Sequence, residues 1–265
     1  MRQGKCFTED ENEVASLLFR VAKTLMASGA HTARIVNTLT RFANGFGFDV
    51  DIFITYGGIT FTLFHKDDPK ISCVKSHSIS IHGVNLSLVA AIGHLSWDVL
   101  EKETTLKQVV ARLDELEKKP RYSRLTTLAM VSLADGAFCK LFGGDYYGMF
   151  LAFVATFIGL FVRQKTLKAN LFISVTLASF TASTIASVGV IYNLGETSHI
   201  ALATTVLFLI PGVPLISAGL DILEGHVSTG IARAFTASGI IASIAAGIMC
   251  AMFLLGLGAW KNFMV

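Results

Sequence analysis

Residues 198–220 read SHIALATTVLFLIPGVPLISAGL, a run of apolar side chains interrupted by Pro211 and Pro214. A bilayer core about 30 Å thick is crossed by a helix of roughly 20 mostly apolar residues, and this stretch is long enough. Each proline lacks an amide N–H and crowds the carbonyl four residues earlier, so the carbonyls of Leu207 and Ile210 are predicted to lose their helical partners. The sequence therefore predicts a membrane helix that breaks or kinks near its middle.

Four further stretches of similar length and apolar character occupy most of the remaining C-terminal part, at about 125–142, 146–162, 169–192 and 234–259. No water is present at that depth to satisfy backbone groups, so such segments are helices and not strands. A soluble helical core can imitate one or two of these runs, but five in succession predict an α-helical integral membrane protein with five transmembrane helices.

Charged residues are concentrated before this apolar part. Residues 1–121 carry 15 Lys and Arg and 14 Asp and Glu, which leaves only 7 and 5 of the chain's 22 and 19 for residues 122–265. The shift predicts a soluble α+β domain over 1–121 and a transmembrane domain over 122–265. Helical and strand periodicities in the first part predict elements at about 8–29, 32–46, 48–54, 59–63, 71–82, 86–100 and 104–118.

Lys and Arg in the short connections set the orientation, because cationic loops tend to remain on the cytoplasmic side. The connections at 143–145 and 193–196 hold neither residue type. We therefore expect a cytoplasmic N-terminal domain and a C-terminus outside the membrane. The polar first residues lack the apolar segment of a signal peptide. The cations assigned to the inner side are Lys118, Lys119, Arg121, Arg124, Arg163, Lys165, Lys168 and Arg233.

Residue types that carry catalysis or bind metals are scattered. The four cysteines form no CxxC pair, so we expect no disulfide framework, no metal site and no cofactor. His77 and His82 fall on opposite faces of a predicted strand, and no GxSxG or HExxH motif accompanies them. The net charge of +3 is small, and no nucleic-acid-binding pattern is present. A polar strand face explains the serines and histidines of this segment better than a hydrolase site.

Asp135 is an acidic residue inside an apolar stretch. It follows Arg124 by eleven residues, which is about 16 Å along a helix and close to the bilayer midplane. An unpaired carboxylate there costs about 2.5–3.5 kcal/mol on insertion scales, and such residues usually face a cavity or a partner. We predict a role for Asp135 in proton coupling or substrate contact, with helix packing by a protonated or hydrogen-bonded Asp as the alternative.

The interrupted stretch is a second candidate site. Broken helices at mid-membrane depth commonly mark transporter binding sites, because freed carbonyls bind cations and the positive end of the next half-helix attracts a carboxylate. Prolines also kink helices for packing alone. The residues predicted to line the path are Pro211, Gly212, Pro214 and Ser217. Charged residues at the cytoplasmic end are predicted to form a gate or an ion pair, with a solvated loop as the alternative; they are Asp221, Glu224, His226 and Arg233.

Small residues recur at helical spacing in two of the predicted spans. Small faces allow helices to approach closely, so we predict tight packing there, and a Ser-lined polar path is the alternative. One stripe consists of Gly230, Ala234, Ser238, Ala242, Ala246 and Cys250, and the other of Ser179, Ser183 and Ser187 beside Ala178, Ala182 and Ala186.

Several motifs resemble those of a known family. They are Gly29-Ala30-His31-Thr32-Ala33-Arg34, Leu141-Phe142-Gly143-Gly144-Asp145, and Pro211-Gly212-Val213-Pro214-Leu215 continuing to Asp221-Ile222-Leu223-Glu224-Gly225-His226 and Gly230-Ile231-Ala232-Arg233. With them, almost the whole chain resembles the threonine/serine exporter (ThrE-type) family, especially its N-terminal half-module. That half-module also occurs as a separate subunit of a two-component system associated with succinate export.

The resemblance implies export of small carboxylate metabolites, either threonine and serine or succinate-like dicarboxylates, across a bacterial inner membrane by an ion gradient. Fused exporters carry a second hydrophobic module, whereas this sequence ends soon after its fifth predicted span. A second small multi-span membrane subunit is therefore expected as a partner, and a homo-oligomer stays open. The alternatives are a membrane-anchored sensor or regulator and a membrane-linked hydrolase that uses the N-terminal domain.

Overall fold

The computed structural model describes residues 9–66, 72–79, 83–101, 104–119, 122–167 and 170–256. The chain forms two compact units, and it enters the first of them twice. The first unit combines Met1–Pro120 with Gly212–Phe235, and the second combines Arg121–Pro211 with Thr236–Val265. This division differs from the boundary at 121/122 that composition suggests, because the segment after Pro211 packs with the N-terminal residues despite its apolar sequence.

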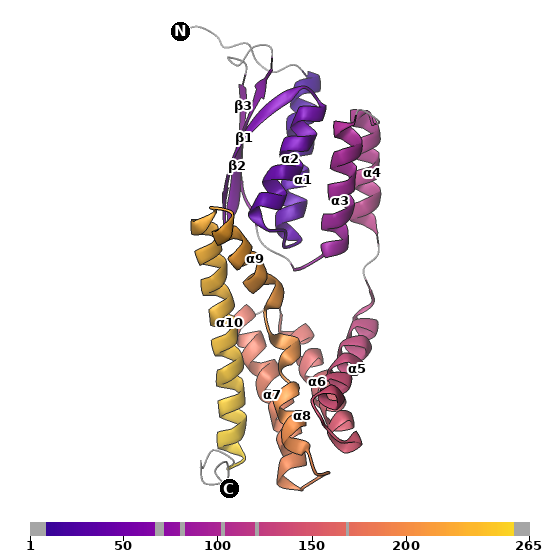
Figure 1. The fold of residues 1–265 in the computed structure, drawn as a ribbon, viewed down its shortest axis with the longest axis vertical. Helices are drawn as coiled ribbons and strands as arrows, with labels where there is room; N and C mark the ends of the chain where they lie inside the picture. The colour runs from indigo at the N-terminus through magenta and orange to yellow at the C-terminus, as the bar shows by residue number, and fades with distance from the viewer. Residues whose placement is uncertain are drawn as a thin grey trace. The chain divides into compact units, whose positions relative to one another are not determined.

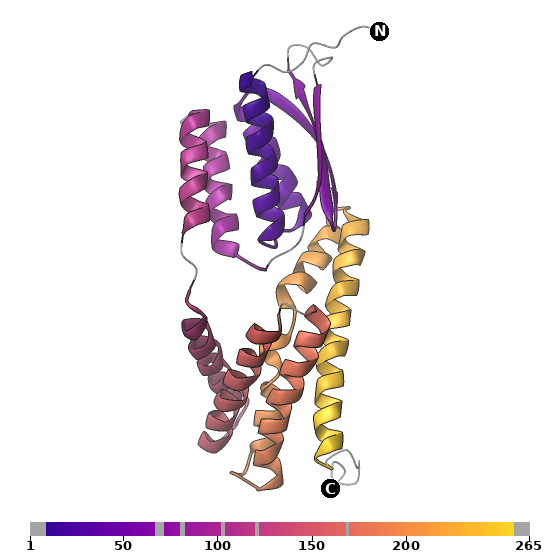
Figure 2. The ribbon, with the colours of Figure 1, turned by 180° about the vertical axis from the view of Figure 1, so that it is seen from behind.

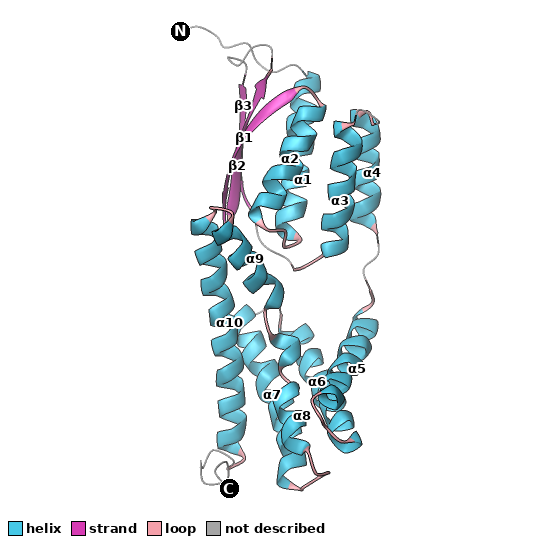
Figure 3. Ribbon diagram, in the orientation of Figure 1, coloured by secondary structure: helices cyan, strands magenta, loops and turns pink. Residues whose placement is uncertain are grey.

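The first unit combines the only strands in the described residues with several helices (Figures 1 and 3). Its elements are α1 (Glu9–Ala27), α2 (Thr32–Gly45), β1 (Phe48–Thr55), β2 (Gly58–His65), β3 (Ser72–Ser78), α3 (Leu86–Leu100), α4 (Leu106–Lys118), α9 (Gly212–Leu223) and the first part of α10 (Val227–Leu254). The elements predicted at about 48–54, 59–63, 86–100 and 104–118 are confirmed. Of the strand predicted at 71–82, the described part contains β3, and residues 71 and 80–82 lie outside the described residues.

The three strands form an antiparallel sheet in the order β1-β2-β3, with Thr55 opposite Gly58 at the hairpin turn. Alternation decides its two faces, since successive side chains in a strand point to opposite sides. Phe61 and Leu63 of β2 are buried, whereas Asp49 and Asp51 of β1 are exposed. The hairpin of β1 and β2 therefore has one buried face and one exposed face.

Helices α1 and α2 lie against the buried face of the sheet, and α3 and α4 lie behind them as a further layer (Figure 1). The apolar stripes of these helices meet in one core, where Leu18, Leu39 and Phe42 are at most 1% exposed. Val109 and Leu113 of α4 are fully buried in the same core, so this amphipathic helix packs within the first unit.

Helices α9 and α10 form a close pair within the first unit. Gly225, with φ of +88°, ends α9 in a backbone conformation that glycine adopts without strain. A side chain at Gly230 would bring its Cβ to 2.9 Å from the Ala218 carbonyl oxygen and 2.6 Å from Ile222 Cγ1. The glycine at this position therefore permits the close approach of the two helices.

The second unit is helical throughout its described residues (Figure 2). Its elements are α5 (Arg124–Leu141), α6 (Tyr146–Thr166), α7 (Leu171–Ile191), α8 (Ser198–Thr204), the 3-10 turn η1 (Leu207–Leu209) and the later part of α10. Helix α6 packs between α5 and α7, and α8 contacts all three.

Small and polar side chains occupy much of the interior of this unit beside a cluster that includes Val175, Leu209 and Ile244, and many large apolar side chains lie on its surface. The predicted Ser and Ala stripe of α7 is buried from Ala178 to Ser187. Among the exposed side chains are Met130, Phe150, Phe161, Ile173 and Phe253, which are 46–85% exposed. Such a surface is stable in lipid and not in water, since large exposed apolar faces otherwise drive association.

Gly230, the first residue of the small-residue stripe predicted on α10, packs closely against α9, but the part of the stripe in the second unit is exposed. Ala242, Ala246 and Cys250 are exposed, and the helix instead buries the neighbouring face that carries Ile244 and Gly247. A Cβ at Gly247 would lie 2.6 Å from the Thr176 carbonyl oxygen of α7. The contact between α10 and α7 therefore depends on Gly247 and the face around it, and not on the small residues that recur every fourth position.

Among the described residues, three helices are long and apolar enough to cross a membrane, namely α6, α7 and α10. The helical segments 198–209 and 212–223 make a fourth if they form one bent span. The predicted first span, α5, is a helix of the expected length, but it carries Arg124, Asp135 and Lys140 within its 18 residues. Because of these three charges, α5 is less apolar than the other helices and is not among the candidate spans.

The predicted break in the fourth span is confirmed. Helix α8 ends at Thr204, η1 covers 207–209, Ile210 is extended, and α9 begins at Gly212 directly after Pro211. The Leu207 carbonyl has lost its helical partner, as predicted, because the residue four positions later is Pro211. It accepts a 3-10 hydrogen bond from the Ile210 amide at 3.1 Å instead.

Candidate functional site

Asp135 lies on the buried face of α5, with 3% of its surface exposed. The Thr156 hydroxyl of α6 donates to Asp135 Oδ2 at 2.6 Å and lies 3.4 Å from the Thr205 carbonyl oxygen. Three helices of the second unit therefore meet around one carboxyl group. Asp135 faces the interior of the unit, as expected for an acid in an apolar helix.

Two polar atoms of this cluster lack a hydrogen-bond partner among the described residues, namely Asp135 Oδ1 and Thr205 Oγ1. Both residues are at most 3% exposed. A buried polar atom without a partner is destabilising, and such atoms often mark a place where a ligand, an ion or a proton completes the bonding. The hydroxyls of Ser183 and Ser187 on α7 share this property.

The second unit also contains a structural carboxylate, Asp145, just before α6. Its Oδ1 accepts from the Gly148 amide at 2.7 Å and its Oδ2 from the Glu196 amide at 2.9 Å, while its own amide donates to the Thr197 hydroxyl at 2.7 Å. These bonds, first the one from Gly148, hold the pKa of the Asp145 carboxyl below its usual range. Asp145 thus caps α6 and ties its start to the loop before α8.

The residues predicted to line a path lie on both sides of the break. Pro211 is buried at the end of the second unit, whereas Gly212 and Pro214 are half-buried in the first turn of α9. Ser217 follows on the buried face of α9, with 6% of its surface exposed. Pro211 belongs to the second unit with Asp135, whereas Gly212, Pro214 and Ser217 belong to the first.

The residues predicted to form a gate or an ion pair separate into a buried pair and a peripheral pair. Asp221 is fully buried, and its Oδ2 lies 3.0 Å from Arg233 Nε, although the two are not aligned as a linear hydrogen bond. Glu224 Oε1 lies 3.9 Å from His31 Nε2 near the surface. His226 takes part through its backbone, since its amide donates to the Asp221 carbonyl at 2.7 Å.

The buried pair binds the N-terminal residues. Asp221 Oδ1 accepts from the Thr32 amide at 2.7 Å, and Arg233 Nη2 donates to the Ala30 carbonyl at 3.0 Å. Sequence reasoning missed these contacts, because they join residues about two hundred positions apart. The motif at 29–34 drew attention to this segment through family resemblance, but it did not indicate that the segment contacts Asp221 and Arg233.

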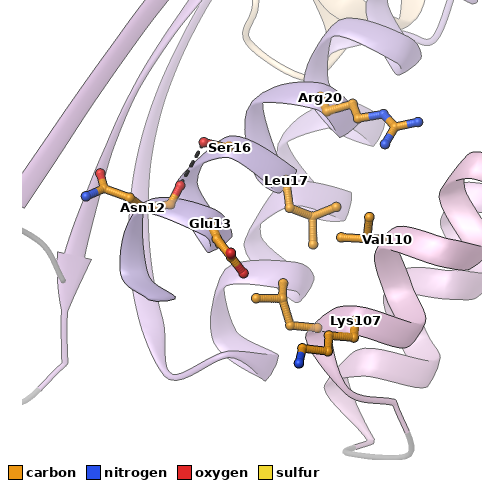
Figure 4. A pocket seen from close by; sticks show the side chains of 8 residues that line it. Asn12, Glu13, Ser16, Leu17, Arg20, Lys107 and Val110 are labelled. Atoms are coloured by element: carbon orange, nitrogen blue, oxygen red, sulfur yellow. Dashed lines mark hydrogen bonds between the residues drawn. The ribbon is translucent and has the colours of Figure 1, made fainter. Parts of the chain in front are cut away.

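An open groove of about 830 Å³ lies between α1 and α4 in the first unit (Figure 4). Leu17 and Val110 form its apolar part, and Glu13, Lys107 and Arg20 lie around them. Arg20 also pairs with Glu117 and Asp114 of α4, each at 2.5 Å. The groove contains none of the residues predicted from the sequence, and its charges serve at least in part to join the two helices.

Apolar helices, an interrupted span and a buried carboxylate are features that many membrane transporters share. The chain belongs to the threonine/serine exporter family: the family described as "Putative threonine/serine exporter" matches residues 16–255. Neither a sensor nor a hydrolase is favoured by this membership, and the protein is a transporter and not an enzyme.

Curated relatives extend over nearly the whole chain. A protein of Klebsiella aerogenes named "Probable succinate transporter subunit YjjP" is 31% identical over 95% of this chain and 97% of its own length. Its namesake in Escherichia coli is 30% identical over 96% of this chain and 99% of its own length. A "Probable threonine/serine exporter" of Mycobacterium tuberculosis is 26% identical over 91% of this chain but only 46% of its own length. No solved structure gives a significant match.

Proposed function

We propose that the protein is one subunit of a secondary transporter that exports small carboxylates, with succinate-like dicarboxylates as the first candidates and threonine and serine as the second. The observation that carries this proposal is the match over 95% and 96% of the chain to relatives named as succinate transporter subunits. The partner is a second, small multi-span membrane subunit of the bacterial inner membrane, and a homo-oligomer is the alternative assembly.

In this proposal, α5 counts as a fifth span, with the N-terminal domain in the cytoplasm and the C-terminus outside. The buried position of Asp135 supports a membrane location for α5, because a carboxylate that faces other helices adds little cost to insertion. Lys140 lies 4.4 Å from the centroid of the Tyr146 ring, which supports an interfacial position for the end of this helix.

The substrate carboxylate binds at the start of α9. The first amides of a helix lack intrahelical acceptors and carry the positive end of the helix dipole, so they attract anions. Pro211 supports this role because it ends the preceding segment and leaves the first turn of α9 beginning at Gly212. Ser217, one turn further along, is the side chain proposed to contact the substrate in the same region.

Asp135 carries the coupling ion or proton in this mechanism. Its unpartnered Oδ1 and the nearby Thr205 hydroxyl are the atoms that a bound ion or proton would engage. Transport then alternates access around the interrupted helix while Asp135 loads and unloads. The buried Ser183 and Ser187 hydroxyls support a polar route along α7.

The test is efflux of succinate, threonine and serine from loaded bacterial cells that lack other exporters and produce this chain with its small membrane partner. Pro211→Ala and Asp135→Asn are expected to lose most of the efflux. Ser132→Ala is the matched control for Asp135, since Ser132 is also buried on α5 but bonds only to the Leu128 carbonyl of its own helix. Wild-type efflux in both variants would discard these assignments, and no efflux of any of the three substrates by the unmodified pair would discard the function.

A further inference from the structure

Helix α2 begins without a cap from its own neighbours. Its N-cap residue, His31, makes no side-chain hydrogen bond to the first turn. The first amides of a helix have no intrahelical acceptor, so the Thr32 amide needs a partner from elsewhere. Asp221 supplies it at 2.7 Å, and a carboxylate at a helix N-terminus is also favoured by the helix dipole.

The same carboxylate is one half of a buried ion pair. The Asp221 side chain is completely buried and the Arg233 side chain is 10% exposed. Burial of two charges is stable only if further hydrogen bonds compensate for the lost water. The turn before α2 provides them, through the Thr32 amide for Asp221 and the Ala30 carbonyl for Arg233.

A third contact holds the start of α10. The Thr229 hydroxyl lies 3.3 Å from the Ile54 carbonyl of β1, and Thr229 is 2% exposed. The α9–α10 pair is therefore bound at two places of the N-terminal fold, the turn at 28–32 and the end of β1. All of these residues belong to the first compact unit.

We propose that Asp221 and Arg233 are positioning residues of a fixed joint, which attaches α9 to the turn before α2 and stays closed throughout transport. A gate would have to open this pair, which would leave two buried charges and the start of α2 without partners. Because α9 begins at Gly212 and contains Asp221, the joint sets where the anion-attracting end of α9 points. The N-terminal domain is then a working part of the transporter. The effect on transport rests on the proposed function.

Cross-linking across the joint distinguishes a fixed contact from a gate. His31 and Glu224 lie at its partly exposed edge, with 25% and 37% of their side chains exposed. We would place cysteines at both positions (His31→Cys, Glu224→Cys) in a chain without its four native cysteines, and join them with a short bifunctional methanethiosulfonate, whose disulfide bonds to the two cysteines can be reduced. Efflux in the presence of the partner subunit is expected to remain after cross-linking. Loss of efflux that reappears when the cross-link is reduced would overturn the proposal.

A positioning role also predicts rescue. Asp221→Asn removes the charge of the pair and is expected to weaken efflux, and the cross-link between positions 31 and 224 should restore it because it holds α9 in place. A defect that persists in the cross-linked Asp221→Asn protein would overturn positioning as the role of Asp221.

Hydrogen exchange of the Thr32 amide tests the joint without transport. In Asp221→Ala the amide loses its acceptor, and its exchange is expected to accelerate by at least about tenfold, whereas Glu224→Gln should leave it unchanged. Equal protection of Thr32 in wild type and in Asp221→Ala would refute the joint. Accelerated exchange in a protein pair that exports nothing would instead retain the joint and reject the proposed function.

Discussion

Replacement of Arg233 by methionine tests how strongly the buried ion pair stabilises the first compact unit. Methionine keeps most of the side-chain volume but leaves the Asp221 carboxylate, which is 0% exposed, with the Thr32 amide as its remaining partner. Removal of one member of a buried pair typically costs about 3–5 kcal/mol. For a protein of roughly 150–250 residues this corresponds to a decrease in Tm of about 6–20 °C.

The assay is thermal unfolding of the purified full chain in detergent, followed by the fluorescence of Trp97. This residue lies on α3 of the same unit, with Arg41 4.7 Å from its ring centroid, and Trp260 would be replaced by Phe to isolate its signal. Glu224→Gln is the control, because a partly exposed pair contributes only about 0–1 kcal/mol. A decrease for Arg233→Met no larger than that of the control would refute the reasoning.

A double replacement separates the pair from its surroundings. Asp221→Leu combined with Arg233→Met exchanges both charges for apolar side chains, and such exchanges are often close to neutral, unlike removal of one charge. The double variant is therefore expected to unfold at a higher temperature than Arg233→Met alone. A lower Tm in the double variant would show that the bonds to Thr32 and Ala30 matter more than the charge pair itself.

Three further predictions concern the second unit. Thr156→Val keeps the side-chain shape but removes the hydrogen-bond donor to Asp135. We expect the free energy of unfolding to decrease by about 1–3 kcal/mol and efflux to be lower. Unchanged efflux would contradict a coupling role for this cluster. Gly159→Leu would place a Cβ 2.8 Å from the Cβ of Ala182. Such overpacking destabilises a protein by about 1–3 kcal/mol, so the monodisperse fraction in size-exclusion chromatography should decrease. A wild-type profile would contradict the packing of α6 on α7. Asp145→Ala should lower Tm at neutral pH. Hydrogen bonds depress the pKa of this carboxyl, so its stabilising effect is complete above the ordinary pKa of about 4 and is lost as pH falls through the lowered value. The Tm values of wild type and variant should therefore converge in acid. A pH-independent difference in Tm would contradict this.

Local chemistry made much of the fold predictable. Period-two alternation located β1, and the apolar runs located α6 and α7, because these patterns reflect which side of an element is buried. The break before Gly212 was predictable for the same reason, since a missing amide N–H acts on neighbours within the same turn.

Asp135 was also recognisable from the sequence, because a lone acid in an apolar stretch must turn away from lipid. Its contacts were not recognisable. Thr156 and Thr205 complete the cluster from two other helices, and threonines are too common in such segments to be singled out.

The sequence by itself determined that this chain is a helical membrane protein with a polar α+β part, since composition and periodicity depend only on neighbouring residues. Only the tertiary structure decided that the segment after Pro211 joins the N-terminal unit, and that the later part of α10 packs by the face of Gly247 and not by Ala242, Ala246 and Cys250 of its more regular stripe. The physical reason is the same in both cases. A buried charge such as Asp221, or a close backbone approach, is stable only with a partner from a distant part of the chain, and no local pattern identifies that partner.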